Sequence, residues 1–95
     1  MPDKDAYVQK LHAKIDEWNA DLDRLNARLD RLEAQQRGAL QKQIEDLKAQ
    51  CRALGQKAAD LQNRGGSAWE DLKQGIDQAR ETLETSVNTA KSRFP

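Results

Sequence analysis

Few side chains in this sequence could do chemistry, and their spacing does not gather them into a site. His12 is the single histidine of the chain. A zinc site needs several clustered nitrogen or sulfur ligands, and only scattered carboxylates lie near His12 in the sequence. We predict that His12 lies at the surface or at the edge of a helix seam, and that the chain uses no metal and no cofactor. The alternatives for His12 are a metal ligand or a pH-sensing group.

Cys51 is the single cysteine, so the chain cannot form an internal disulfide. It continues the apolar pattern of its neighbours, which predicts a small buried hydrophobic side chain. The alternative is a redox switch that joins two chains. The sequence places no histidine or basic cluster that would clearly activate the thiol.

Three aspartates, Asp16, Asp23 and Asp30, recur every seven residues. On a helix they lie about 10.5 Å apart along the axis, which is too far for the ligand shell of one calcium ion. A solvated face is the favoured interpretation. The sequence also has no Ser–His–Asp set and no phosphate-binding glycine loop, so we predict that the protein is not an enzyme.

The charge balance and hydropathy exclude further classes. Lys and Arg number 16, as do Asp and Glu, so the net charge is zero. Affinity for nucleic acid comes largely from neutralising phosphates, and no basic excess is available for that. No run approaches the roughly 20 apolar residues that span a bilayer, and the first residues lack the apolar stretch of a signal peptide. We therefore expect a cytoplasmic protein that binds neither nucleic acid nor membranes.

Long helices must carry these residues. The chain is 34% charged and only 4% aromatic, which argues against a broad globular core. Its prolines stand at positions 2 and 95, so no proline interrupts a helix between them. Apolar residues alternate at steps of three and four, which is the heptad pattern of a coiled coil. The first run, called here the 8–32 seam, consists of Val8, Leu11, Ile15, Trp18, Leu22, Leu25, Leu29 and Leu32. A second run consists of Leu40, Ile44, Leu47, Cys51, Leu54, Ala58 and Leu61. One extra residue enters the repeat near Gln36, which predicts a local change of supercoil without requiring a break.

A turn follows at 64–67, where two glycines can end a helix, and Ser67 with Glu70 has the spacing of a capping box. The third apolar run consists of Trp69, Leu72, Ile76, Ala79, Leu83, Val87, Ala90 and Phe94. We predict an all-α fold with a single domain over 1–95: one helix over about 4–63, the turn, and an antiparallel helix over about 68–92. This helical hairpin is a coiled coil that is expected to assemble into an elongated helical bundle.

Antiparallel partners in a hairpin have position numbers that total a constant. A total of 130 gives nearly every seam position an apolar partner and places Gln36 opposite Phe94. The predicted hairpin-packing residues are Leu40, Ile44, Leu47, Cys51, Leu54, Leu61, Trp69, Leu72, Ile76 and Leu83. Gly55 and Gly75 fit the same total, which predicts that the two backbones come close there.

In that hairpin the first helix continues for about 45 Å beyond its partner. The 8–32 seam then has no partner within the chain, and so long an apolar stripe is an interaction surface. We predict self-association through this seam as a dimer or tetramer, or docking on a helix of an unidentified protein. Parallel and antiparallel pairing are both open, and exchange of the second helix between copies would give similar contacts.

Two stretches resemble a known family. One contains Tyr7-Val8, Lys10-Leu11 and Trp18; the other is residues 68–73, Ala-Trp-Glu-Asp-Leu-Lys. Together they resemble small coiled-coil proteins of proteobacteria and cyanobacteria that are often labelled stress-response proteins. The resemblance implies a stress-related role and supplies no enzymatic activity, cofactor or catalytic residue.

The leading hypothesis is a non-enzymatic structural or adaptor protein that self-associates through the 8–32 seam, with a stress-related role. The alternative is an amphipathic protein that coats membranes or hydrophobic granules. A third hypothesis is a chain that is partly disordered alone and folds on a partner or on drying, which the high charge and low aromatic content allow.

Overall fold

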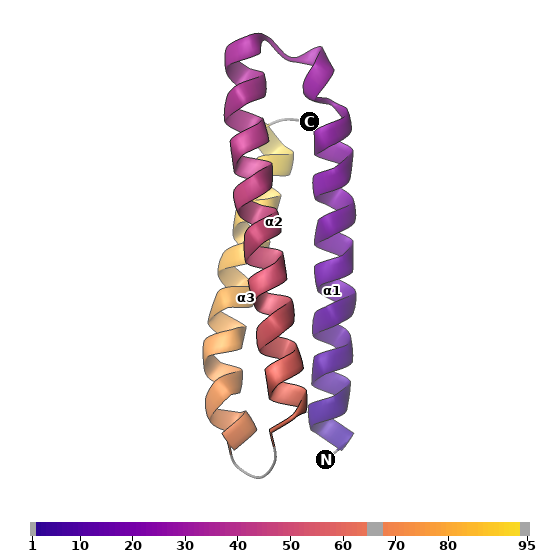
Figure 1. The fold of residues 1–95 in the computed structure, drawn as a ribbon, viewed down its shortest axis with the longest axis vertical. Coiled ribbons are helices and arrows are strands. Elements are labelled where there is room, and N and C mark those ends of the chain that lie inside the picture. Colours follow the sequence, from indigo (N-terminus) through magenta and orange to yellow (C-terminus); the bar gives the residue numbers. More distant parts are fainter. Residues whose placement is uncertain (1, 65–67, 94–95) are drawn as a thin grey trace.

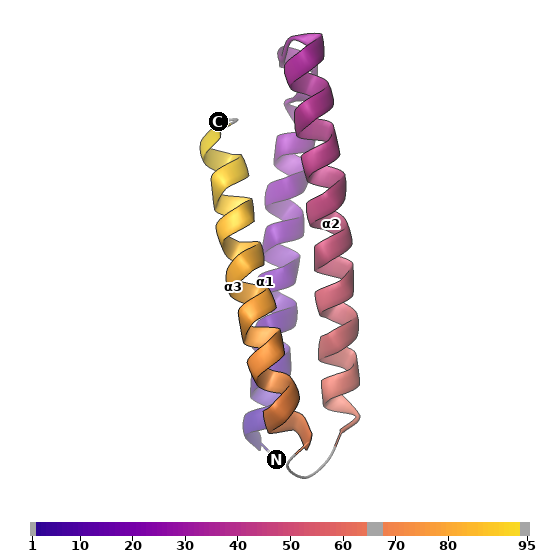
Figure 2. The same cartoon turned by 90° about the vertical axis from the view of Figure 1, so that its left-hand side faces the viewer.

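A computed structural model describes residues 2–64 and 68–93. The elements are helix α1 (Pro2–Ala27), a 3-10 turn η1 (Leu29–Arg31), helix α2 (Ala34–Gln62) and helix α3 (Ala68–Arg93). The predicted all-α fold is confirmed, and no strand occurs within the described ranges. The three helices lie side by side in a rod of 52 × 18 × 17 Å (Figures 1 and 2).

The chain runs along the rod three times (Figure 1). Helix α2 returns antiparallel to α1, and α3 returns antiparallel to α2, so α1 and α3 are parallel. The bounds of α3 agree with the predicted second helix to within one residue at its C-terminal end. The predicted glycines of the turn, the capping serine Ser67, and Phe94 lie outside the described residues.

The structure differs from the predicted single helix over 4–63, because the chain turns back at residues 28–33, called here the hinge. Leu32 (φ −98°, ψ 155°) and Glu33 (φ −62°, ψ 155°) have extended backbones between η1 and α2. Each helical residue lost costs only a few tenths of a kcal/mol in propensity, whereas each large apolar side chain buried gains about 1.5–3 kcal/mol. Burial of the 8–32 seam within the chain therefore outweighs helix continuation.

The core is one apolar cluster that runs the length of the rod. From α1 it contains Val8, Leu11, Ile15, Trp18, Leu22 and Leu25, each with an exposed fraction of 6% or less. From α2 it contains Leu40, Ile44, Leu47, Cys51, Leu54, Ala58 and Leu61, and from α3 Trp69, Ile76, Leu83, Val87 and Ala90. Leu29 and Leu32 are half-buried against this cluster at the hinge end.

Two polar contacts, one to α2 and one to the residues that follow it, bracket the register of α1 against α2. Lys4 Nζ donates a hydrogen bond of 2.6 Å to the carbonyl oxygen of Arg64, and Lys48 Nζ lies 2.6 Å from Asp23 Oδ1. The position numbers of these pairs total 68 and 71. When the position numbers of facing residues total 69, every buried seam residue of α1 lies opposite an apolar residue of α2. The pairs in this register are Val8–Leu61, Leu11–Ala58, Ile15–Leu54, Trp18–Cys51, Leu22–Leu47 and Leu25–Ile44.

Candidate functional site

A row of polar contacts, called here the polar ladder, joins the parallel helices α1 and α3. Each contact links residues 70 positions apart, which is ten heptads, so the two helices keep one register along the rod. Its rungs are Tyr7–Asp77, Lys14–Glu84 and Asp21–Lys91. The ladder was not predicted, because a single antiparallel hairpin does not bring these residues of α1 and α3 together. The available signal was the seven-residue spacing of the rung residues on each helix.

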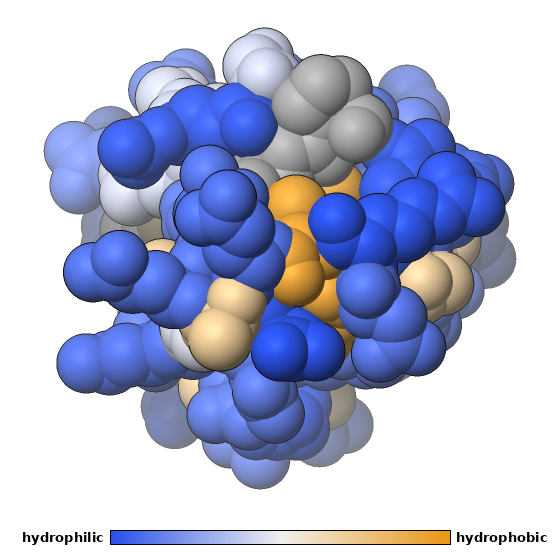
Figure 3. Space-filling view, turned by 90° about the horizontal axis from the view of Figure 1, so that it is seen from above, coloured by the Kyte–Doolittle hydropathy of each residue, from blue (hydrophilic) through white to orange (hydrophobic). Residues whose placement is uncertain are grey.

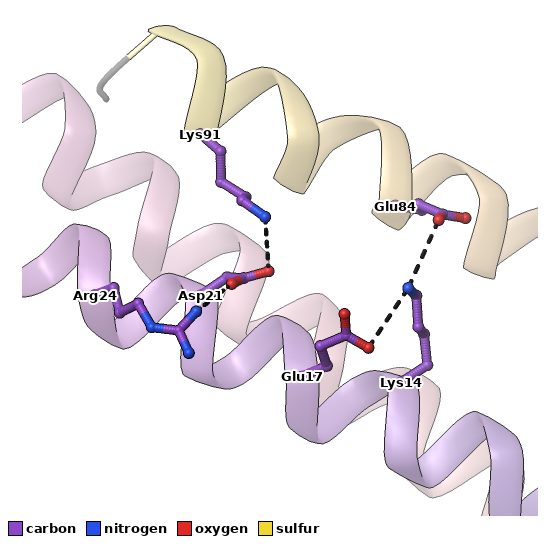
Figure 4. A network of polar contacts seen from close by, with 6 residues as sticks. All are labelled: Lys14, Glu17, Asp21, Arg24, Glu84 and Lys91. Carbon is purple, nitrogen blue, oxygen red and sulfur yellow. Dashed lines mark hydrogen bonds and ion pairs between the residues drawn. The ribbon is translucent and has the colours of Figure 1, made fainter.

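Asp21 is the one charged residue that is buried in the described part of the chain, with an exposed fraction of 8%. Its Oδ1 accepts a 2.8 Å hydrogen bond from Arg24 Nη1, and its Oδ2 accepts one of 3.2 Å from Lys91 Nζ. Figure 4 shows the carboxylate held between the two cations, one from its own helix and one from α3. A buried carboxylate needs such partners because its desolvation is otherwise uncompensated.

The middle rung is more open to solvent. Lys14 Nζ lies 3.6 Å from Glu17 Oε2 and 3.9 Å from Glu84 Oε1, as Figure 4 shows. The same ammonium lies 5.9 Å from the centroid of the Trp18 ring, within the range of a cation–π contact. Solvent-exposed ion pairs contribute little stability, so this rung helps to set the alignment of the helices more than it holds them together.

At the other end of the ladder, the Tyr7 hydroxyl donates a hydrogen bond to Asp77 Oδ1. Lys73 Nζ lies over the Tyr7 ring at 5.2 Å and over the Trp69 ring at 5.7 Å. Desolvation by burial, together with the hydrogen bond to Asp77 and the charge of that carboxylate, raises the pKa of Tyr7 well above its ordinary value. The phenol therefore stays protonated and acts as a donor that couples the two helices.

Cys51 lies in the core with an exposed fraction of 1%, which agrees with its interpretation as a small buried hydrophobic side chain. Burial raises the pKa of the Cys51 thiol, and the charges of Arg52 and Lys48 offset only part of that rise. A protonated, buried thiol is a poor nucleophile and a poor redox switch.

The other polar candidates lie on the surface. His12 is exposed, as are Asp16, Asp23 and Asp30. Asp23 is paired with Lys48. Within the described residues, no three His, Cys, Asp or Glu side chains form a group that could hold a metal ion. No helix in the described ranges is long and apolar enough to cross a membrane.

A shallow groove follows the crevice between α2 and α3. Two adjoining hollows of about 350 and 220 Å³ form it, and both are lined by Lys57 and Gly75. Leu72 lines the smaller hollow with Lys57 and Asp60 of α2 and is 41% exposed, so it lies at the edge of the hairpin contact and outside the core. The predicted close approach at Gly55 and Gly75 is wrong, because a Cβ at either position would meet no atom within 4 Å.

The predicted oligomer interface does not lie exposed in this fold. The six residues of the 8–32 seam from Val8 to Leu25 are in the core, and Leu29 and Leu32 are half-buried. The premise that this stripe lacks a partner within the chain is therefore wrong, because the hinge returns α2 along it. Self-association through the seam stays a prediction, and it requires that a second chain replace the contacts α1 now makes.

Within the described residues, the apolar run of α3 from Trp69 to Ala90 is also turned inward, apart from Leu72. The site that the helices build is thus one apolar core shared by all three helices, with the polar ladder along the parallel pair α1 and α3. Comparison with protein-family models, curated proteins and solved structures finds no match to this chain, so its similarity to the coiled-coil stress-response family stays an interpretation of the quoted residues.

Proposed function

We propose that this chain is a non-enzymatic structural or adaptor protein that acts by self-association through the 8–32 seam. The observation that carries the proposal is the apolar register of α1 against α2. The seam of α1 is buried from Val8 to Leu25 in one apolar cluster with α2 and α3, and a second copy of the chain offers the same faces once its own α1 has left them. The helix faces are therefore complementary between chains as well as within one chain.

The chemistry of the core supports a non-enzymatic role. Burial raises the pKa of Cys51 and keeps its thiol protonated, and Tyr7 is likewise a protonated hydrogen-bond donor. Asp21 is engaged by two cations in the polar ladder. These groups act in helix pairing, and their partners leave them little freedom for proton transfer or nucleophilic attack.

A surface-coating role has less support, because the described apolar residues of α3 that would contact a membrane or granule are buried in the bundle, apart from Leu72. The stress-related role rests on the resemblance alone. The cytoplasmic location rests on the low apolar content of the sequence alone.

Sedimentation equilibrium over a wide range of chain concentrations tests the proposal. We expect the mass to rise from the 10.8 kDa of one chain toward twice that value. A mass of 10.8 kDa at every concentration contradicts self-association.

Leu72→Lys is a matched variant for locating the interface, because Leu72 lies outside the seam and 41% exposed in the α2–α3 groove. We expect it to associate like the unchanged protein. Loss of association in this variant would assign the interface to the groove and contradict the proposal that the interface is the 8–32 seam.

A further inference from the structure

We infer that the hinge straightens into helix, so that α1 of one copy packs against α2 and α3 of a second copy in a reciprocal dimer. The inference rests on the proposed self-association and specifies how the buried seam reaches another chain. Exchange of an identical element is a low-cost route to a dimer, because the contacts within the unit already exist.

The first support is the chemistry of the hinge. Residues 28–33 read Arg-Leu-Asp-Arg-Leu-Glu and contain neither glycine nor proline. No side-chain hydrogen bond caps the start of η1 at Arg28 or the start of α2 at Glu33. Turns are normally held by glycine, proline or capping side chains that disfavour helix, and this segment uses none of them. Its sequence therefore accommodates a straight helix as readily as a turn.

The second support is the phase of the apolar pattern across the hinge. The extra residue near Gln36 makes Leu29, Leu32, Gln36 and Leu40 follow steps of three, four and four. Eleven residues complete three helical turns to within about 20°. In a straight helix the seams of α1 and α2 therefore lie on one continuous face, which a second antiparallel chain can follow without a break.

The third support is that exchange keeps the contacts between the helices and brings the hinge ends of the two copies together. The core contacts and the rungs of the polar ladder are kept, with α1 supplied by the other chain. The hinge end of the bundle, where Leu29 and Leu32 are half-buried, becomes the middle of the dimer. Figure 3 looks onto this end and shows apolar atoms enclosed by hydrophilic ones. The straight helix from Pro2 to Gln62 would be about 90 Å long, so the dimer is a longer rod.

The experiment refolds an equal mixture of ¹⁴N- and ¹⁵N-labelled full-length chains at micromolar and at millimolar concentration. Monomer and dimer fractions are separated and treated with a carbodiimide, which joins Lys to Asp or Glu side chains that lie in contact. Mass spectrometry of the cross-linked peptides then reports whether Lys91–Asp21 joins chains of one isotope or of both.

Exchange predicts that half of the Lys91–Asp21 cross-links in the dimer fraction carry both isotopes and that those in the monomer carry one. A dimer whose cross-links carry one isotope alone overturns exchange and leaves self-association standing through another surface. Absence of a dimer at both concentrations overturns exchange and the proposed self-association together.

Ala34→Pro separates the two hinge forms. Ala34 is the first residue of α2, where proline is favoured, and Glu33 has the extended ψ that proline requires of its predecessor. In a straight helix the same proline stands mid-helix and weakens the dimer by about 100-fold for each chain. We expect the variant to fold as a monomer and Ala34→Ser to dimerise like the unchanged protein. Equal dimerisation of the two variants overturns the inference.

Deletion of residues 29–32 is expected to favour the dimer, whereas Ala34→Pro favours the monomer. The deletion removes the segment that lets α2 turn back along α1. Shortening a hinge favours exchange between copies. We expect this variant to refold as a dimer at micromolar concentration, with Lys91–Asp21 cross-links of both isotopes. A folded monomer overturns the inference, and the Ala34→Pro comparison still decides it if the deletion variant fails to fold.

Discussion

The face between α1 and α2 and the face between α1 and α3 are built on opposite plans. The first is antiparallel, and its buried seam residues are apolar from Val8 to Leu25. The second is parallel and is marked by the three rungs of the polar ladder. Apolar burial is strong but not directional, whereas paired polar groups are weaker and tolerate few alignments. We infer that the apolar face supplies most of the stability and that the ladder selects where α3 sits against α1.

The largest expected effect comes from breaking the apolar face. Leu22 is fully buried, so Leu22→Ala removes apolar contacts and leaves a cavity. We expect a loss of about 2–5 kcal/mol in the free energy of unfolding, measured by urea titration. Leu72→Ala is the matched control, because Leu72 is 41% exposed, and it should cost far less. Equal losses would contradict the assignment of the core.

Asp21→Asn weakens the buried rung of the ladder. It removes the charge that Arg24 and Lys91 share, and we expect a loss of about 1–2 kcal/mol, since both cations are partly exposed. Asp16→Asn on the exposed face serves as the control, with an expected change below about 0.5 kcal/mol. If the two variants unfold at the same urea concentration, the ladder contributes nothing beyond a surface charge.

Tyr7→Phe removes the hydroxyl that donates to Asp77, and we expect a loss of about 1 kcal/mol at neutral pH. The pKa of Tyr7 is raised in the folded chain, so its contribution is complete below the unfolded pKa of about 10. It is lost as pH rises above that value toward the folded pKa. The difference in stability between the two proteins should therefore shrink in alkaline urea titrations. A difference that stays constant with pH would show that the hydroxyl does not titrate with folding.

The smallest effect concerns the groove between α2 and α3. A Cβ at Gly75 would meet no atom within 4 Å, so Gly75→Ala improves helix propensity without a clash. We expect a gain of about 0.5–1 kcal/mol, which corresponds to a rise in Tm of about 2–8 °C. Gly55→Ala should gain as much, because a Cβ there is also unobstructed. Destabilisation by Gly75→Ala alone would show that α2 and α3 approach more closely than the structure indicates.

The sequence predicted local features well and tertiary alternatives poorly. The heptad rule placed Val8 to Leu25 on one apolar face, and the glycine turn placed the start of α3, because both depend on neighbouring residues. The hinge at 28–33 was missed, since its residues favour helix and only burial of the seam decides the turn. Leu72 fits the apolar spacing of α3 yet faces solvent, because one heptad position can lie beside the crevice between two helices instead of inside it. The ladder was missed because a parallel pair appears only once a third helix is known.

The two registers have a consequence for how such a rod could change length. Opposed positions on α1 and α2 total about 69, and those on α1 and α3 differ by 70, so layers of the bundle repeat every seven residues. Seven residues added to each helix at the same layer would reproduce every facing pair and extend the rod by about 10.5 Å. An insertion that is not a whole number of heptads would turn polar rungs toward the apolar seams, and a heptad added to one helix alone would separate the residues that now face each other. The length of the rod can therefore change only in steps of one heptad, about 10.5 Å each.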